Sequence, residues 1–362
     1  MASPRQMTSL NGTEKDSDKT HFMNDVPKQL PEGILDVDAT ELHRFVDNHT
    51  LVHLKGQIER PLFVSILQHG DETTGWDAMK LLLLNHQNKL PRSIYLLFGN
   101  VQAARINSRQ LDDQPDFNRC WPGIHNQQNE VAKTMQEITD LMARIKPFAS
   151  VDIHNNSGRN PHYAGINSLQ TPFVNLASLF SDTIIHFTSP DGIQSGAFAR
   201  FCPSVTIECG MSGTADGIEQ THTFLENLIH LPSLKSVPGV AEHRQVLNIF
   251  STVKVKPEVS IGIQGEVTHP VNFIINDDLD YHNFHLLESG TEFGRLDHED
   301  TIMPFVVTDQ IGHDITDHYF EKRGTSVCIK QPVIPAMITQ SIRAIRLDCL
   351  CYLMHPMNPN HP

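Results

Sequence analysis

The chain has 362 residues, with 28 Lys and Arg against 42 Asp and Glu, which gives a formal net charge of −14. This length suffices for a full hydrophobic core and suggests two domains. The acidic balance disfavours a nucleic-acid backbone or an anionic membrane surface as the partner, because both bind clustered Lys and Arg. A small molecule or a short peptide fits better.

The first 48 residues are predicted to be a polar leader followed by a short helix. Residues 1–33 are rich in Ser, Thr, Asp and Lys, and they contain neither the apolar stretch nor the cleavage site of a secretory signal. A helix is expected from Ala39 to Asn48, with Asp38 as its cap. No window of the sequence approaches the ~18 apolar residues of a membrane span.

The six cysteines are scattered without the spacing of a disulfide framework. This pattern indicates a reduced, intracellular setting, which we take to be the cytoplasm. Cys349 and Cys351 could be interpreted as a metal-binding pair. Because they lie two residues apart in an apolar run, we interpret them instead as two small apolar residues on one buried face.

Strand and helix patterns alternate between residues 50 and 231. Apolar, β-branched runs predict strands at 51–54, 62–67, 93–98, 148–153, 183–187 and 204–207. Amphipathic stretches predict helices at 75–88, 127–145 and 217–229. The alternation predicts an α/β domain over residues 49–237, with a mixed, largely parallel sheet flanked by helices. Short runs between Gly, Pro and Asp turns predict a smaller β-rich domain over residues 238–362.

Metal-ligating and acid–base side chains follow directly on three of the predicted strands. His69 and Glu72 follow one strand, His154 a second and Glu208 a third. In open α/β sheets, ligands bind outside the carboxyl ends of the strands, so these side chains can meet at one site. Two imidazoles and one carboxylate are a typical ligand set of catalytic zinc. Asp152 points the same way along its strand as His154 and is placed to accept the other imidazole N–H.

These residues lie in motifs spread over residues 55–212. The motifs are His69-Gly-Asp-Glu72-Thr, Gly99-Asn100, Arg109, Asp116-Phe-Asn118-Arg119, Asp152-Ile-His154-Asn and Thr206-Ile-Glu208-Cys-Gly210. In their order and approximate spacing they resemble the succinylglutamate desuccinylase/aspartoacylase family, a branch of the zinc carboxypeptidase superfamily. The resemblance implies a zinc carboxypeptidase-like fold and a hydrolase that cleaves an amide bond adjacent to a carboxylate, as in an N-acyl amino acid.

The resemblance also implies a role for each site residue. One zinc ion is expected on His69, Glu72 and His154, and Glu208 is expected to act as the general base that activates the zinc-bound water. Arg109 is expected to polarise the scissile carbonyl. The substrate-binding residues that the resemblance implies are Asn118, Arg119, Arg200 and Tyr319.

Two other functions stay open at this stage. One is a metallocarboxypeptidase that acts on peptides, and the other is a non-catalytic zinc-binding or sensing protein on the same fold. Glu208 favours an enzyme, because a binding module has no use for a general base. Amide and ester hydrolysis need the same residues. The sequence also leaves open whether the chain forms a homo-oligomer, and whether Arg159 and His162 belong to a pocket specific to this protein or are ordinary loop residues.

Overall fold

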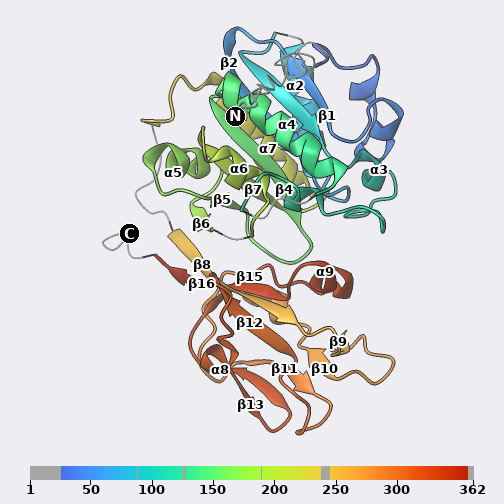
Figure 1. Cartoon of the computed structure of the whole chain (residues 1–362), viewed down its shortest axis with the longest axis vertical. Coiled ribbons are helices and arrows are strands. Elements are labelled where there is room, and N and C mark those ends of the chain that lie inside the picture. Colours follow the sequence, from blue (N-terminus) through green and yellow to red (C-terminus); the bar gives the residue numbers. More distant parts are fainter. Residues whose placement is uncertain (1–25, 88, 125–127, 189, 238–244, 358–362) are drawn as a thin grey trace, which may run out of the picture.

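The computed structural model describes residues 26–87, 89–124, 128–188, 190–237 and 245–357, which form two lobes (Figure 1). Most of the predicted leader lies outside the described residues. A 3-10 helix, η2 (Ala39–Arg44), replaces the longer helix expected there, and Asp38 makes no side-chain cap. The carboxylate of Asp38 instead accepts a hydrogen bond from Lys80 Nζ at 3.4 Å. Within the described chain, no helix combines the length and apolar character needed to cross a membrane.

The N-terminal lobe is built on the larger part of an 11-stranded sheet. The strand order is β1-β3-β2-β4-β7-β5-β6-β8-β16-β15, with β12 also paired to β8. Strands β3, β2, β4 and β7 run parallel, whereas β1 and β5 run antiparallel to their neighbours β3 and β7. The strands of this lobe are β1 (Thr50–Leu54), β2 (Ile58–Ile66), β3 (Arg92–Phe98), β4 (Ala149–Asn156), β5 (Tyr163–Ile166), β6 (Thr183–His186) and β7 (Ser204–Met211).

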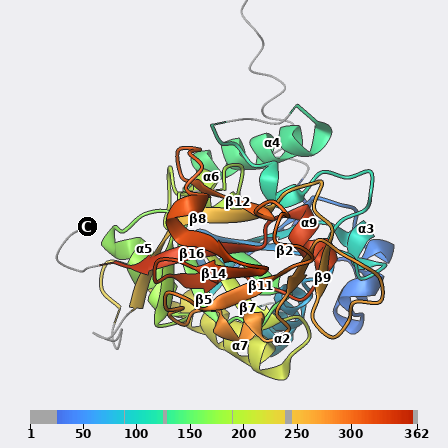
Figure 2. The ribbon, with the colours of Figure 1, turned by 90° about the horizontal axis from the view of Figure 1, so that it is seen from below.

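Helices cover both faces of this sheet (Figure 2). Because side chains alternate along a strand, Val64 and Ile66 pack into one core with α2, α5 and α7, while Phe63 packs into the other with α4 and α6. The helices of the lobe are α2 (Thr74–His86), α3 (Val101–Ala104), α4 (Glu130–Ile145), α5 (Thr171–Ser178), α6 (Gln194–Phe198) and α7 (Ala215–His230), with the 3-10 helices η1 (Ile34–Asp36) and η3 (Phe117–Arg119). The predicted mixed, largely parallel α/β fold is therefore confirmed.

The C-terminal lobe adds a second sheet of five strands in the order β13-β14-β11-β10-β9. Phenylalanine rings fill its core in edge-to-face contacts, among them Phe293 with Phe320 at 5.2 Å and Phe305 with Phe320 at 4.7 Å. The elements of this lobe are β8 (Gln245–Val255), β9 (Ile261–Ile263), β10 (Phe273–Ile275), η4 (Leu279–His282), β11 (Glu292–Leu296), β12 (Phe305–Asp309), α8 (Thr316–Tyr319), β13 (Phe320–Arg323), β14 (Ser326–Ile329), β15 (Ile334–Ala336), α9 (Ile342–Leu347) and β16 (Cys351–Pro356).

Strand β8 joins the two lobes. Its first residues, Gln245 to Asn248, pair in parallel with β6, and its later residues pair with β12 and β16. A hydrophobic cluster spans the same junction, with Tyr163 and Ile185 from the N-terminal lobe and Ala336 and Tyr352 from the C-terminal lobe. The large sheet therefore continues from the N-terminal lobe into the C-terminal lobe through β8. This strand begins at Gln245, a few residues after the predicted domain boundary between residues 237 and 238.

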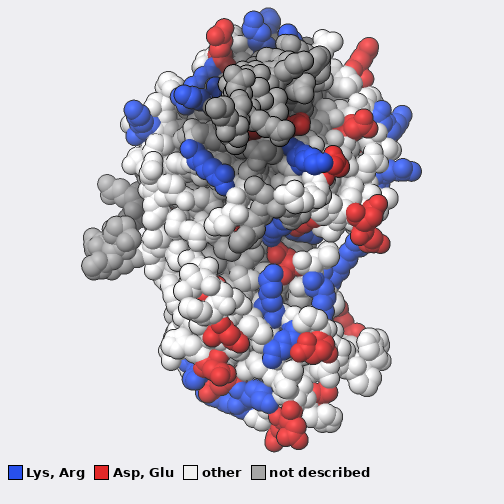
Figure 3. All heavy atoms as spheres, in the orientation of Figure 1, with Lys and Arg blue, Asp and Glu red and all other residues white. Residues whose placement is uncertain are grey.

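Charged side chains of both signs are interspersed over the face shown in Figure 3, where the described Lys and Arg residues do not gather into one extended area. All six cysteines are buried, and none of them forms a disulfide bond within the described part of the chain. Cys349 and Cys351 lie in hydrophobic clusters, which agrees with the apolar interpretation of that pair.

A loop of the N-terminal lobe, residues 157–162, holds the C-terminal lobe in place. Asn160 Oδ1 accepts a hydrogen bond from Met337 N at 2.9 Å, and Thr339 Oγ1 donates to the Ser157 carbonyl at 3.1 Å. The Arg159 guanidinium lies over the ring of Tyr281, 4.3 Å from its centroid. Gly158 makes the closest approach, since a Cβ atom there would lie 2.0 Å from the Ile338 carbonyl oxygen.

We expect Gly158→Ala to weaken this junction, because the methyl group would meet backbone that cannot move aside. The free energy of unfolding should fall by about 1–3 kcal/mol, the usual cost of overpacking, as measured by urea denaturation. Gly196→Ala in α6 is the matched control, because its nearest contact would be the Ile193 side chain at 3.3 Å. A Gly158→Ala variant as stable as the control would contradict the close packing of the two lobes.

Candidate active site

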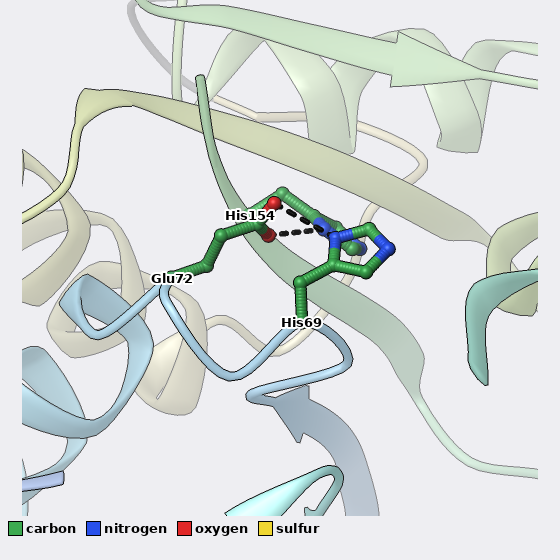
Figure 4. A group of neighbouring side chains, drawn as sticks. All are labelled: His69, Glu72 and His154. Atoms are coloured by element: carbon green, nitrogen blue, oxygen red, sulfur yellow. Dashed lines mark hydrogen bonds and ion pairs between the residues drawn. The ribbon is translucent and has the colours of Figure 1, made fainter. Parts of the chain in front are cut away.

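His69, Glu72 and His154 converge at the carboxyl ends of β2 and β4 (Figure 4). The candidate ligand atoms of the three residues all lie within 4.8 Å of one another. Glu72 is the centre of the group: its Oε1 lies 2.7 Å from His69 Nδ1 and its Oε2 lies 2.6 Å from His154 Nδ1. All three side chains are buried. The His–Glu–His cluster expected from the motifs is therefore present.

Local backbone contacts explain why His69 and Glu72 point to the same place. After β2 the chain changes direction at Leu67, which has a positive φ of 56°. Residues 69–72 then form a turn in which Glu72 N donates a hydrogen bond to the His69 carbonyl at 3.2 Å. Gly70 N donates to the Arg109 carbonyl at 3.0 Å, which fixes the turn against the loop after α3. His154 reaches the same point because β4 lies beside β2 in parallel register.

Each imidazole has a second carboxylate on the nitrogen that faces away from Glu72. His69 Nε2 lies 3.0 Å from Asp116 Oδ1, and His154 Nε2 lies 2.8 Å from Asp152 Oδ2. Such outer carboxylates orient metal-binding imidazoles and fix the nitrogen that carries the proton. The expected contact of Asp152 is confirmed. Asp116 was part of a recognised motif, but its partner could not be found in the sequence because 47 residues separate it from His69.

The buried carboxylates and imidazoles shift one another's pKa values. Burial disfavours ionisation of Glu72, but the imidazoles of His69 and His154 outweigh this effect and lower its pKa. Burial likewise disfavours the imidazolium of His154, yet the carboxylates of Asp152 and Glu72 raise its pKa well above the ordinary value. Glu72 is thus held as a carboxylate, the form in which it can bind a cation.

Glu208 lies beside this cluster on β7, where it is the direct strand partner of His154. Its Oε2 is buried and has no hydrogen-bond partner among the described residues. Burial raises the pKa of Glu208 to about 8. An unpaired carboxyl group that titrates near neutral pH is suited to accept a proton and to return it.

A cavity of about 490 Å³ lies over these residues, between the two lobes. The N-terminal lobe contributes His69, Glu72, His154 and Glu208, together with the loop residues Arg109, Asn118 and Arg119. The C-terminal lobe contributes residues of β15, α9 and β16 and their flanks, which are Ala336, Met337, Ser341, Arg343, Ala344, Leu347, Asp348 and Tyr352.

Both cavity arginines of the N-terminal lobe are paired with carboxylates. The Arg109 guanidinium donates to Asp116 Oδ2 at 2.9 Å and lies 3.7 Å from Glu72 Oε1. The Arg119 guanidinium donates to Asp348 of the C-terminal lobe, 3.3 Å from Oδ1. Arg119 therefore connects the two lobes within the cavity.

Asn118 is engaged in the hydrogen-bond network around the His–Glu–His cluster. Its Nδ2 donates to Asp152 Oδ2 at 3.1 Å and lies 3.0 Å from His154 Nε2, while its Oδ1 accepts from Gln194 N at 3.0 Å. Both polar atoms of the amide thus have partners within the protein.

The structure does not bring every expected residue to the cavity. Arg200 borders a separate cavity of about 310 Å³ and donates to the Pro122 carbonyl at 3.1 Å. Tyr319 lies in the C-terminal lobe against Phe250, with ring centroids 4.9 Å apart. Neither is among the described residues that line the main cavity. The same holds for Arg159 and His162, which belong to the loop that contacts the C-terminal lobe.

Several cavity residues were missed in the sequence. Tyr163 lies on β5, a strand of only four residues that carries no clear pattern. Asn156 lines the cavity with both side-chain polar atoms buried and without partners among the described residues, a state that has no sequence signal. Asp348 and Tyr352 lie far from the motifs in the chain and reach the cavity only through the packing of the lobes.

Comparisons with known proteins agree with this architecture. Residues 62–230 match the model of the succinylglutamate desuccinylase/aspartoacylase catalytic domain. No curated protein sequence gave a match. Among solved structures, a succinylglutamate desuccinylase/aspartoacylase from Rhodobacter sphaeroides has a TM-score of 0.55 and 13% identity, over 86% of this chain and 89% of that chain.

Two further structures have the same fold. The succinylglutamate desuccinylase from Chromobacterium violaceum has a TM-score of 0.52 and 14% identity, over 85% of this chain and 89% of that chain. Murine aminoacylase 3 has a TM-score of 0.50 and 13% identity, over 84% and 96% of the two chains. Residues 62–230 thus match the catalytic-domain model of the succinylglutamate desuccinylase/aspartoacylase family, and the solved structures share the fold of the chain.

Proposed function

We propose that this protein is a zinc-dependent hydrolase that cleaves the amide bond of an N-acyl amino acid next to its carboxylate. The observation that carries the proposal is the unpaired Glu208 oxygen, which lies in one cavity with His69, Glu72 and His154. The match of residues 62–230 to the succinylglutamate desuccinylase/aspartoacylase catalytic domain supports the reaction class. A module that only binds a metal or a ligand would gain nothing from a buried, unpaired carboxyl group, which costs free energy.

The donor set fits a zinc ion. Two imidazole nitrogens and one carboxylate are a common three-residue set of catalytic zinc, and the carboxylates of Asp116 and Asp152 are placed to orient the imidazoles. His69, Glu72 and His154 would hold the ion. When bound, zinc acts as a Lewis acid and lowers the pKa of a coordinated water to about 7.

Glu208 would move the proton that hydrolysis requires. Its unpaired Oε2 accepts a proton from the attacking water as the bond from the water oxygen to the acyl carbon forms. The same carboxyl group then returns the proton to the amine nitrogen as the carbon–nitrogen bond breaks. In the complete reaction, one water and one N-acyl amino acid yield a carboxylic acid and a free amino acid.

Two loop arginines would act on the substrate directly, and Asn118 would act indirectly. Arg109 lines the cavity beside Glu72, where its guanidinium would stabilise the negative charge that develops on the carbonyl oxygen. Arg119 would bind the substrate carboxylate, because a guanidinium can donate two parallel hydrogen bonds to it. Asn118 would act through His154, since both of its polar side-chain atoms are already engaged.

Replacement of Glu208 by Gln should abolish proton transfer while the side chain keeps its shape. We expect kcat to fall by about 10²–10⁴-fold, with the zinc content unchanged. The measurement is amine release from a panel of N-acyl amino acids and dipeptides, with and without a chelator. Glu219→Gln on the exposed side of α7 is the matched control.

Two outcomes of that panel would contradict the proposal. Full activity of the Glu208→Gln variant would refute the proposed role of Glu208 as the general base. Turnover of dipeptides but not of N-acyl amino acids by the wild-type chain would favour the carboxypeptidase alternative, and no turnover at all by the zinc-loaded chain would favour a binding protein.

Metal analysis tests the ligand set directly. We expect the purified wild-type chain to retain one zinc ion and Glu72→Gln to lose it, because that change removes the anionic ligand. The matched control is Glu226→Gln, since Glu226 also lies between two histidines, 2.9 Å from His86 and 3.7 Å from His230. A chelator should lower the melting temperature of wild type and control, because zinc stabilises only the folded state to which it binds. Zinc retained by Glu72→Gln would refute the assignment.

Arg119→Lys tests the carboxylate contact. A lysine keeps the charge but loses the paired hydrogen bonds, so we expect KM to rise about 10-fold to 100-fold with a smaller change in kcat. Arg200→Lys is the matched control and should leave KM unchanged, because Arg200 does not line the main cavity. The reverse result, with KM raised only by Arg200→Lys, would restore the substrate role that the motifs suggested for Arg200.

A further inference from the structure

The proposed chemistry uses only one side of the cavity. Beyond Glu208, the large sheet continues through β5, β6, β8 and β16. The cavity-lining side chains on this side are apolar or aromatic, and we call five of them the apolar wall: Tyr163, Ile185, Phe187, Ile249 and Met337.

Strand register places this wall next to the reacting groups. Tyr163 on β5 is the direct partner of Glu208 on β7, and Gly165 on β5 is the partner of Ile185 on β6. Tyr163 and Gly165 share one face of β5, because side chains alternate along a strand. The wall therefore begins beside Glu208 and extends away from the metal ligands.

A glycine makes room for the ring of Phe187. A Cβ atom on Gly165 would lie 2.4 Å from Cε1 of the Phe187 ring. The ring thus occupies the space that a side chain on β5 would otherwise fill. Phe187 N also donates to the Ile166 carbonyl at 3.1 Å, which holds this residue against β5.

The C-terminal lobe completes the wall. The Tyr163 hydroxyl donates to Met337 Sδ at 2.9 Å, so its polar atom is used within the protein. Ile249 from β8 lies in the same hydrophobic cluster as Tyr163 and Ile185, with Phe187 and Met337 packed against it. The wall is a preformed apolar surface shared by both lobes.

Charged side chains around the cavity lie elsewhere. Among the described lining residues, β5, β6, β8 and β15 contribute none. The arginines among the described lining residues are Arg109 and Arg119, which are paired with Asp116 and Asp348, and Arg343 of α9. Arg343 is largely exposed and lies 3.8 Å from Asp112. An acidic group placed against the apolar wall would lose its hydration without gaining a cationic partner, which is unfavourable.

We propose that the apolar wall binds a large apolar group of the substrate, so that the preferred substrates are N-acyl amino acids with an aromatic or long aliphatic group. This inference rests on the proposed function. A cavity of about 490 Å³ lies within the ~300–1,000 Å³ range of small-molecule sites, which are lined mainly by hydrophobic side chains with a few placed polar groups. The apolar group can belong to the amino acid or to the acyl chain.

A substrate panel on the full zinc-loaded chain separates these two sources. N-acetyl-L-phenylalanine and N-acetyl-L-leucine carry the apolar group on the amino acid, and N-hexanoylglycine and N-phenylacetylglycine carry it on the acyl chain. The references are N-acetylglycine and N-acetyl-L-aspartate. We expect kcat/KM of at least one apolar pair to exceed both references by ~10–200-fold, the range that a hydrophobic pocket provides. A preference for N-acetyl-L-aspartate over all four apolar compounds would overturn the inference.

Variants of Phe187 test the wall itself. Phe187→Ala should lower the ratio of kcat/KM for the preferred apolar substrate over N-acetylglycine by about 10-fold. Phe187→Leu should keep most of the ratio, because the wall stays apolar. Phe201→Ala is the matched control, since Phe201 is a partly buried phenylalanine packed in a different cluster, with α4 and α6. A ratio unchanged in a folded Phe187→Ala variant would remove Phe187 from the substrate site.

Binding measured by calorimetry tests the apolar wall independently of the proposed hydrolysis. If none of the N-acyl compounds is hydrolysed, the proposed function fails, but their binding to the full chain still tests the wall. Binding of N-acetyl-L-phenylalanine or N-hexanoylglycine at least ~10-fold tighter than N-acetyl-L-aspartate supports the inference. Equal or weaker binding of both apolar compounds overturns it.

Discussion

The carboxylate of Glu72 lies between two buried imidazoles, and the remainder of the site depends on this contact. It is possible because β2 and β4 are neighbours in parallel register and release their chains at the same edge of the sheet. Because the site is buried, a carboxylate or an imidazolium without a partner would be unfavourable there. Each of these groups therefore needs a partner of opposite charge or a metal ion. Asp116 and Asp152 extend this requirement to the outer nitrogens. Asp116 thereby connects the loop of residues 109–119 to the geometry of the His–Glu–His cluster.

Much of the N-terminal lobe could be predicted from the sequence, because apolar periodicity and strand-end motifs are local signals. The strand runs ending near His69, His154 and Glu208 were found in this way, and the three strands prove to be adjacent. Strand β5 was missed because it has only four residues, and α9 because its six residues lie in a chain region with mixed apolar and basic character. Short elements owe their structure to tertiary packing more than to their own pattern.

Contacts between residues that lie far apart in the chain could not be predicted from the sequence. The pairing of Arg119 with Asp348 spans 229 residues, and the approach of Tyr163 to Met337 spans 174. Neither follows from spacing or composition. The same reason explains Arg200 and Tyr319, whose expected roles came from motif position alone: the fold directs Arg200 to another cavity and Tyr319 to the side of the C-terminal lobe. The motifs at strand ends predicted correctly that His69, Glu72 and His154 lie together, whereas motif position alone did not predict which other residues line the cavity.

The continuity of the large sheet through β8 has an evolutionary consequence. The proposed metal ligands and the proposed general base all come from residues 62–230, whereas about a quarter of the residues that line the cavity come from chain segments after residue 330. Strand β8 pairs with β6 of the first lobe and with β16 of the second, so these segments are held beside the cavity, and substitutions in them can alter which compounds fit without changing the proposed reacting groups. Evolution can therefore reshape this side of the cavity separately from the proposed reacting groups, in a part of the chain that the catalytic-domain match does not include.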